Sequence, residues 1–441
     1  MQNILLLISS LLFYAWGEPK FAAVMVLSIL LNWFFGLMAE RFRTKKGVLR
    51  FWLVAATVFN LGLLFIFKYL MFTLNNVNAV FGLNINVPVI NLPIGISFFT
   101  FQAFSYVLDI SRGVCEAQKN PLYAGLYVSF FPQLIAGPIV RYETIARDIK
   151  HRKENLEDFS LGVSRFIVGF LKKVLLANNM AVIAKAAFDS TEPISTGMAW
   201  LGLIAYTFQI YYDFSGYSDM AIGMGKMFGF HFLENFDYPY VSKSVSEFWR
   251  RWHISLGTWL RDYVYFPMGG SRVKTKSRLV FNLFVVWLLT GLWHGANWTF
   301  TVWGLMYFVL ITFEKLTGFE QKGKKLEPLK HIYTMAFVMA GWVIFRARDL
   351  SAAGEYFLAL SGLAGSSFLD GEFFLHFKQN LIFLLACALF SAPIISFLKK
   401  RFTPRYKTAD VLVAAGFIFF LAVAVSYLIK GTYNPFIYFN F

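Results

Sequence analysis

The stretch VFNLFVVWLLTGLWHGANWTFTVWGLMYFVL, residues 280–310, decides the fold class. It is almost wholly apolar, and about twenty apolar residues suffice for one helix to cross a bilayer. One histidine, His294, lies in its middle with Gly291, Gly295 and Asn297 around it. An ionisable side chain at membrane depth is costly and tends to mark a functional cavity, although a lone histidine can also be a satisfied core residue. The glycines leave room either for a ligand or for the close approach of another backbone.

Apolar runs of this kind recur along the whole chain. Hydrophobic residues make up 57% of the 441 residues and charged residues only 15%, whereas soluble domains carry about 25% charged residues. We therefore predict an all-α polytopic integral membrane protein. The first run has no basic n-region and no small-residue cleavage site, so we expect a retained helix. The predicted spans are 2–16, 20–40, 51–73, 93–110, 122–140, 159–186, 197–214, 216–233, 279–293, 296–314, 331–346, 379–397 and 409–430.

The net charge of +16 is concentrated in a few loops between these runs. Five basic segments hold 28 of the 41 Lys and Arg residues, whereas 74–92 and 187–197 hold none. The positive-inside rule places the five segments in the cytoplasm. The basic residues thus indicate membrane topology and no nucleic-acid partner. The segments are 41–50, 141–153, 243–278, 315–330 and 399–407.

This topology predicts irregular membrane segments. Because 74–92 is expected outside and 141–153 inside, residues 93–140 must cross the membrane an odd number of times. Two apolar runs occupy them, so one must be re-entrant or interfacial. Backbone breaks at membrane depth are tolerated only where they are buried in protein or line a cavity. The same argument applies to 197–233, where we expect DFSGYSD (213–219) to interrupt the run.

The chain is expected to form one transmembrane domain, 1–441, with its core at 51–316 and an amphipathic or re-entrant cytoplasmic segment at 234–278. Within that segment, Ser244 and Glu247 have the spacing of a capping box. Aromatic and basic residues then recur at helical intervals, which is typical of a helix at a membrane interface. Such a helix could simply cover the helix bundle, or it could form the floor of a cavity and meet an anionic ligand.

A second polar stretch, residues 211–230, lies between apolar runs. Asp213 and Asp219 could orient a histidine or bind an acceptor, although Asp213 could equally cap the following turn. The four-residue spacing of the small residues Ala221, Gly225 and Gly229 predicts a close helix–helix contact.

His294 is the candidate for proton transfer. An imidazole titrates near neutrality and can act as a general base toward a hydroxyl group. The chain has no GxSxG nucleophile motif and no HExxH-type metal spacing. Its two cysteines, Cys115 and Cys387, suggest neither a disulfide framework nor a metal site. These features favour direct transfer onto an activated hydroxyl over a covalent serine enzyme or a zinc hydrolase.

Five stretches together resemble the membrane-bound O-acyltransferase (MBOAT) family, most closely its alginate O-acetyltransferase branch. They follow one another in the same order, from about residue 9 to 315. They are SLLFYAWGEPK, FFPQLIAGPIVRYE, YDFSGYSDMAIGMGKMFGF, NFDYPYVSKSVSEFWRRWHISLGTWLRDYVYFPMGGSR and LLTGLWHGANWTFTVWGLMYF. The resemblance implies a ring of tilted transmembrane helices around a central funnel, with re-entrant segments and a tunnel linking the two membrane faces. His294 corresponds to the family's invariant histidine, and His253 to its second polar position, often histidine or asparagine.

The resemblance leads to a functional hypothesis. An acetyl group passes from cytoplasmic acetyl-CoA to a hydroxyl group of an extracytoplasmic polysaccharide or partner acetyltransferase, in the bacterial cytoplasmic membrane and among its lipids. His294 and His253 are the expected catalytic pair, with no metal and no tightly bound cofactor. Bulk around His294, from Trp293, Trp298 and Trp303, favours a small acyl group. The candidate binding residues for donor and acceptor are Arg250, Arg251, Trp252, Arg272, Asp213, Asp219, Asn297 and Trp298.

Two other functions fit part of the pattern. Transfer of D-alanine from a carrier protein, as in teichoic acid modification, would need a cytoplasmic docking surface instead of a nucleotide pocket. A polysaccharide export subunit without chemistry would also use broken helices and midplane polar residues. Transporters often consist of two matching halves, however, and the sequence contains no such repeat.

Overall fold

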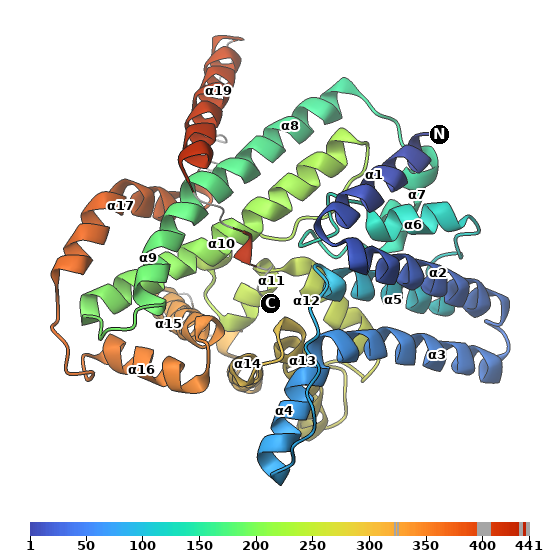
Figure 1. The fold of residues 1–441 in the computed structure, drawn as a ribbon, viewed down its shortest axis with the longest axis horizontal. Coiled ribbons are helices and arrows are strands. Elements are labelled where there is room, and N and C mark those ends of the chain that lie inside the picture. Colours follow the sequence, from blue (N-terminus) through green and yellow to red (C-terminus); the bar gives the residue numbers. More distant parts are fainter. Residues whose placement is uncertain (322, 324–325, 395–406, 432–434, 438–441) are drawn as a thin grey trace. The chain divides into compact units, whose positions relative to one another are not determined.

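The predicted helix pair around the polar break is present as α13 (Lys276–His294) and α14 (Trp298–Thr317). The computed structural model describes residues 1–441 except 322, 324–325, 395–406, 432–434 and 438–441. Only residues 295–297 separate the two helices, which lie side by side (Figure 1). Asn297 caps α14, because its side chain accepts a hydrogen bond from the Thr299 amide at 3.1 Å.

Glycines bring the backbones of α13 and α14 into contact. A Cβ atom at Gly304 would lie 2.5 Å from the carbonyl oxygen of Trp287, and one at Gly291 would clash with the carbonyl oxygen of Phe300. The ring of Phe300 also fills the space beside Gly295. Of the two explanations for these glycines, the close approach of another backbone is therefore the right one at Gly291.

The described residues form two compact units, and helices α8 (Leu156–Leu171) and α10 (Thr196–Met227) contribute to both. The first unit comprises Met1–Ser164 and Ala221–Glu234. Its other helices are α1 (Gln2–Gly17), α2 (Pro19–Arg41), α3 (Lys46–Leu64), the π-helical η1 (Phe65–Tyr69), α4 (Leu70–Phe81), α5 (Ile96–Arg112), α6 (Pro121–Ser129) and α7 (Tyr142–His151).

The second unit comprises Arg165–Met220 and Asn235–Phe441 and contains the α13–α14 pair. Its regular structure is helical throughout the described ranges, with one isolated β-bridge between Phe236 and Trp252. Its remaining helices are η2 (Lys172–Ala177), α9 (Asn178–Phe188), η3 (Pro239–Val241), α11 (Val245–Arg251), α12 (Ile254–Leu260), η4 (Arg261–Tyr265), η5 (Phe319–Gln321), α15 (Glu327–Arg346), α16 (Leu350–Ser361), α17 (Gly371–Phe390) and α19 (Lys407–Lys430).

The all-α membrane architecture is confirmed. Within the described residues, seven helical runs are long and apolar enough to cross a membrane. The predicted basic segment 399–407 lies outside these residues apart from Lys407, as does the end of the predicted span 379–397. The seven runs are Pro19–Arg41, Lys46–Phe81, Leu156–Phe188, Lys276–His294, Trp298–Thr317, Glu327–Arg346 and Gly371–Phe390.

The predicted interruption at DFSGYSD is wrong. Helix α10 runs without a break from Thr196 to Met227. The glycine inside this stretch packs instead: a Cβ atom at Gly216 would lie 2.8 Å from the carbonyl oxygen of Gly169 in α8. Polar residues that suggested a loop are therefore accommodated inside a long helix that a second helix approaches closely.

The predicted helix contact through Ala221, Gly225 and Gly229 also needs correction. Gly225 faces the ring of Phe232, 2.7 Å from an ideal Cβ position, and Gly229 lies beyond the helix end with φ 75°. A second close contact with α8, besides that of Gly216, is made by Gly223, whose carbonyl oxygen would lie 2.6 Å from a Cβ atom at Gly162. The expected type of contact exists, but on a different face of α10.

The close approach of α13 and α14 gives a first prediction. Replacing Gly304 by alanine would drive a methyl group into the carbonyl oxygen of Trp287, which a backbone cannot easily move away from. Overpacking of this kind costs about 1–3 kcal/mol, so thermal unfolding in detergent should begin several degrees lower. The control is Gly62→Ala in α3, where no atom lies within 4 Å of the new Cβ. Equal stability of the two variants would refute the contact.

Candidate functional site

His294 is the last residue of α13 and is buried, with only 3% of its surface exposed. Three aromatic rings surround its imidazole edge-on, with centroid distances of 5.0 Å to Trp293, 5.0 Å to Trp303 and 5.2 Å to Phe345. Trp303 lies on α14 and Phe345 on α15. The imidazole is thus placed by helices from both sides of the polar break.

His253 lies in a turn between two short helices. The expected single amphipathic helix over this segment is wrong, because the chain forms α11, breaks at Trp252 and His253, and restarts as α12. His253 has φ 46°, in the left-handed region that few residues other than glycine adopt. At this turn the His253 side chain is buried, with 1% of its surface exposed. In a continuous helix, the position of His253 along the helix would determine which way its side chain points.

Asn235 holds this turn in place. Its backbone carbonyl accepts the Ile254 amide at 3.0 Å, and its side-chain Oδ1 accepts the Ser255 amide at 3.1 Å and hydroxyl at 2.9 Å. The Nδ1 atom of His253 lies 3.3 Å from the same Oδ1. Because an amide oxygen only accepts hydrogen bonds, this contact favours the tautomer with the proton on Nδ1 and the lone pair on Nε2.

Trp293 contacts both histidines, with centroid distances of 5.0 Å to His294 and 5.8 Å to His253. The ring of Phe214, from α10, packs edge-on against His253 at 4.7 Å. Burial lowers the pKa of His253 from its ordinary value of 6.5 to about 3. At neutral pH this imidazole is therefore uncharged and able to accept a hydrogen bond through Nε2.

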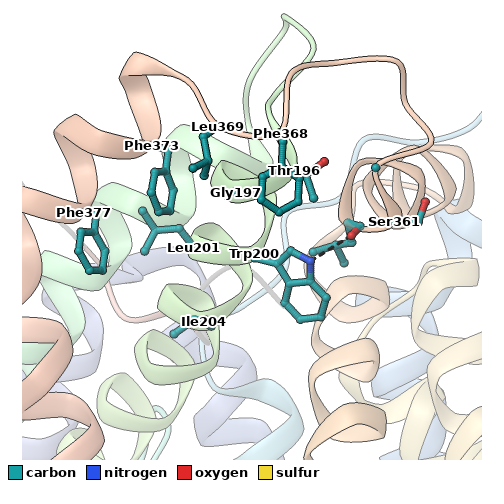
Figure 2. A pocket seen from close by; sticks show the side chains of 12 residues that line it. Thr196, Gly197, Trp200, Leu201, Ile204, Ser361, Phe368, Leu369, Phe373 and Phe377 are labelled. Carbon is teal, nitrogen blue, oxygen red and sulfur yellow. Dashed lines mark hydrogen bonds between the residues drawn. The ribbon is translucent and has the colours of Figure 1, made fainter.

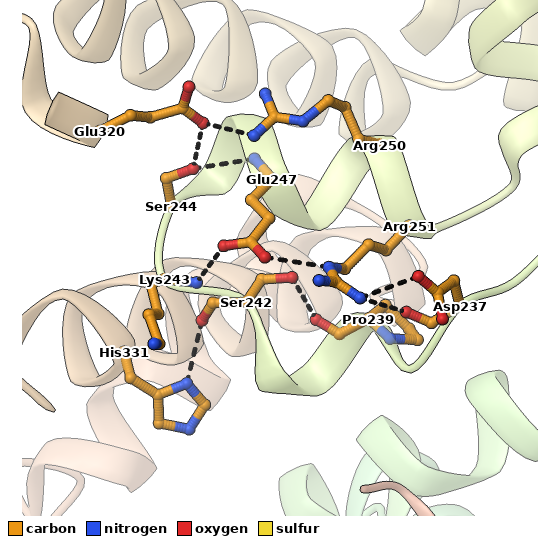
Figure 3. Close-up of polar contacts among 10 residues, drawn as sticks. All are labelled: Asp237, Pro239, Ser242, Lys243, Ser244, Glu247, Arg250, Arg251, Glu320 and His331. Carbon is orange, nitrogen blue, oxygen red and sulfur yellow. Dashed lines mark hydrogen bonds and ion pairs between the residues drawn. The ribbon is translucent and has the colours of Figure 1, made fainter. Parts of the chain in front are cut away.

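The two arginines next to this turn form ion pairs (Figure 3). Arg250 pairs with Glu320 at 2.8 Å, and Arg251 pairs with Glu247 at 3.0 Å and Asp237 at 2.9 Å. Both arginines are candidate binding residues, and both guanidinium groups already have carboxylate partners.

The N-terminus of α11 begins as predicted, with Ser244 accepting the Glu247 amide at 2.8 Å. A carboxylate from another helix reinforces it. Glu314, only 2% exposed on α14, accepts the backbone amides of Val245 at 2.7 Å and Ser246 at 2.8 Å. Negative charge at a helix N-terminus is stabilising. Glu314 thereby fixes α11 to α14.

Four other candidates have contacts or exposure of a different kind. Trp298 begins α14 but is 52% exposed, and Asn297 donates a hydrogen bond to the Arg348 carbonyl at 2.9 Å. Arg272 is exposed in a segment that also carries Lys274, Lys276 and Arg278. Trp252 is a core residue: it is 2% exposed, and its ring packs against those of Phe236, Phe248 and Trp342.

The two aspartates form structural ion pairs inside the second unit. Asp213 contacts Lys173 and accepts the Ile437 amide at 2.6 Å, so it does not cap a turn. Asp219 pairs with Arg165 and Lys172, at 2.6 Å each. The contacts of both carboxylates are thus with cations and backbone. The structure does not bring them to either histidine.

Asn235, Glu314 and Phe345 were missed from the sequence. Glu314 had a detectable signal, since it is a lone carboxylate within a predicted span, where such residues tend to be functional. Asn235 had none, because its role depends on the unexpected turn at His253. Phe345 is one of 52 phenylalanines and nothing in the sequence distinguishes it.

Comparison with known proteins gives consistent matches. The profile of MBOAT, the membrane-bound O-acyltransferase family, matches residues 118–351, which include both histidines. A probable alginate O-acetylase of Pseudomonas putida is 39% identical over the whole chain and 94% of its own length. A peptidoglycan O-acetyltransferase of Helicobacter pylori is 33% identical over 99% of this chain and 91% of its own. A teichoic acid D-alanyltransferase of Bacillus subtilis is 30% identical over 58% of this chain and 69% of its own.

Glu314 provides a graded test of how α11 is held. The variant Glu314→Gln has one side-chain oxygen that can accept a backbone amide, whereas Glu314→Ala has none. An unsatisfied buried amide costs about 1–3 kcal/mol, so the alanine variant should unfold at a clearly lower temperature than the glutamine variant. Glu372→Ala, at a 70% exposed side chain, is the matched control and should be neutral. Identical unfolding of all three variants would mean that Glu314 does not hold α11.

The lowered pKa of His253 predicts a pH dependence of stability. The unfolded chain takes up a proton at His253 below about pH 6.5, but the folded chain does so only near pH 3. Unfolding free energy should therefore fall as the pH is lowered from 6.5 toward 3. The variant His253→Asn removes this contribution, so its stability should decline less over the same pH range in parallel chemical denaturation. Curves that stay parallel would contradict the burial of a neutral His253.

Proposed function

The chain belongs to the membrane-bound O-acyltransferase family, and we propose that it transfers an acetyl group from acetyl-CoA to a hydroxyl group, with His294 as the general base. That the protein is a multi-pass membrane protein and an O-acyltransferase follows from the family. This membership sets aside an export subunit without chemistry. The acetyl donor, the acceptor and the roles of the histidines are the proposed part.

One observation carries the assignment of the site: two buried imidazoles, from different parts of the chain, contact the same tryptophan. His294 lies at the helix break and His253 at the left-handed turn, and both lie against Trp293. General acid–base catalysis needs an imidazole that a substrate can reach at a fixed position. Rings on three sides of His294 restrict how it can move.

The reaction we propose is direct. His294 takes the proton of the acceptor hydroxyl as its oxygen attacks the thioester carbonyl. The carbon–sulfur bond then breaks, the thiolate leaves and is protonated, and the products are the acetyl ester and free CoA. His253, neutral and hydrogen-bonded to Asn235 through Nδ1, orients a hydroxyl group of a substrate by accepting its hydrogen bond through Nε2.

The ion pairs of Arg250 and Arg251 change which residues we expect to bind the acetyl donor. Arg250 and Arg251 already pair with carboxylates, so Arg272 and its exposed basic neighbours are the better match for the phosphates of CoA. Guanidinium groups pair well with phosphate oxygens. The surroundings of His294 also favour a small acyl group, since Trp303 and Phe345 are buried against it. Trp298 is half exposed and does not contribute to this bulk.

For the acceptor, we propose a hydroxyl of a cell-envelope polysaccharide or of a partner acetyltransferase, on the outer side of a bacterial cytoplasmic membrane. Two relatives that match nearly the whole chain are named for O-acetylation of alginate and of peptidoglycan. D-Alanyl transfer is the second candidate, supported by a relative that matches 58% of the chain. The longer matches to O-acetylating relatives favour acetyl transfer.

The test compares donors and variants in one preparation. Wild-type protein should release CoA from acetyl-CoA in the presence of acceptor, with little turnover of D-alanyl carrier protein or palmitoyl-CoA. His294→Ala should reduce acetyl transfer by about 10²–10⁴-fold, the contribution typical of a general base. His331→Ala, whose Nδ1 contacts the Ser242 carbonyl at the far end of α11, is the control and should retain activity. Undiminished transfer by a well-folded His294→Ala would disprove the assignment.

A further inference from the structure

An apolar cavity of about 520 Å³ lies at the N-terminal end of α10 (Figure 2). Three walls enclose it, formed by α10, by the end of α16 with the loop after it, and by the start of α17. All of them belong to the second unit. The proposed acetyl transfer makes no use of this cavity. Its main lining side chains are Trp200, Leu201, Ile204, Leu360, Phe373 and Phe377.

The polar groups of the walls bond to one another. The indole Nε1 of Trp200 donates to the Leu360 carbonyl at 3.0 Å, and the Gly197 amide donates to the Phe368 carbonyl at 2.8 Å. The Ser361 hydroxyl donates to the Leu358 carbonyl at 2.8 Å. A polar ligand would find little to bond with on these walls. Burial of hydrocarbon is the remaining source of affinity.

Exposed apolar side chains lie at the cavity and farther along α17, one of the helices long and apolar enough to cross a membrane. Phe368 is 73% exposed at the rim, and the exposed apolar side chains continue along α17 at Leu381, Ile382 and Leu385. A helix with its side chains is about 10 Å wide, so a cavity of this volume would admit only about one of its turns. A flexible acyl chain fits this opening better than a helix from another protein.

The charges around the cavity indicate which headgroup would lie at its mouth. No Lys or Arg occurs in residues 187–225 or 349–377, which supply all three walls. Two carboxylates lie at the start of α17: Asp370, between the lining residues Leu369 and Phe373, and Glu372, whose side chain is 70% exposed. Glu372 lies 3.7 Å from the imidazole of His376, and exposed Lys378 follows the lining residue Phe377. The two carboxylates outnumber this one lysine, so the start of α17 repels an anionic headgroup and attracts an amine.

We propose that this cavity binds one acyl chain of a phospholipid and prefers an amine-bearing zwitterionic headgroup over an anionic one. The α10 side of the cavity begins at Thr196 and Gly197, at the end of segment 187–197, which lacks basic residues and is expected outside, so the lipid belongs to the outer leaflet. The site does not depend on acetyl transfer.

The cavity can be blocked without touching the histidines. Wild-type protein in nanodiscs of phosphatidylethanolamine, transferred to detergent, should retain one lipid per chain in native mass spectrometry. Leu201→Trp and Ile204→Trp fill the cavity and should reduce retention about tenfold, because displacing even two methylene groups changes affinity by that much. Leu385→Trp places the same residue on the exposed face of α17 and should retain the lipid. Since Ile204 is 37% exposed, its variant tests the site even if Leu201→Trp unfolds.

The headgroup preference is tested separately. Phosphatidylethanolamine should outcompete phosphatidylglycerol of identical acyl chains by roughly two- to fivefold, the size of an exposed charge interaction. Glu372→Lys should abolish or reverse that ratio. If both cavity-filling variants retain as much lipid as the wild type, the acyl-chain site is overturned. Equal retention of the two lipids by wild type, or a ratio that Glu372→Lys leaves unchanged, overturns the headgroup preference.

Discussion

The direct contact between the backbones of α13 and α14 is the constraint on which the site depends. In lipid, no hydrophobic force drives helices together, so they associate through close van der Waals packing of small residues. Gly291 and Gly304 provide that packing, and neither position has space for a side chain. Because α13 ends right after this contact, His294 comes to lie against Trp303 of α14. The three residues of the turn then need only a cap, which Asn297 provides.

The second half of the site depends on polar contacts inside the same unit. Glu314 of α14 accepts hydrogen bonds from two backbone amides of α11 and so connects the two helices. Asn235 then determines where α11 gives way to α12, and with it the position of His253. Two short helices that would be marginal alone are held by side chains from elsewhere in the unit. Glu314 and Asn235 thus position His253, as the contact between Gly291 and Gly304 positions His294.

Hydropathy predicted the all-α membrane fold because a bilayer sets the length of an apolar helix. It also located the α13–α14 break, since a histidine and an asparagine stand out in such a run. Hydropathy failed at DFSGYSD, where the two aspartates of α10 pair with side chains forty or more residues away. Asp213 meets Lys173, and Asp219 meets Arg165 and Lys172. A local pattern cannot reveal partners of that kind.

The candidate site was predictable in part. His294 followed from its position in the sequence, and His253 only from the resemblance to a family. Helical periodicity in fact argued against the observed geometry of His253, since a continuous helix would have no left-handed residue. Arg250 and Arg251 were suitable for phosphates by residue type, but type alone does not tell whether carboxylates already occupy them. Phe345 could not be identified among so many phenylalanines.

The left-handed backbone at His253 restricts which amino acids natural variation can place there. Apart from glycine, asparagine, aspartate and histidine are the residues that adopt this region most readily. Glycine would leave no polar group beside Trp293, and aspartate would bury a charge at great cost. Asparagine alone keeps both a tolerated backbone and a neutral hydrogen-bonding side chain. The alternation of histidine and asparagine that the family resemblance implies at this position thus has a conformational cause as well as a chemical one.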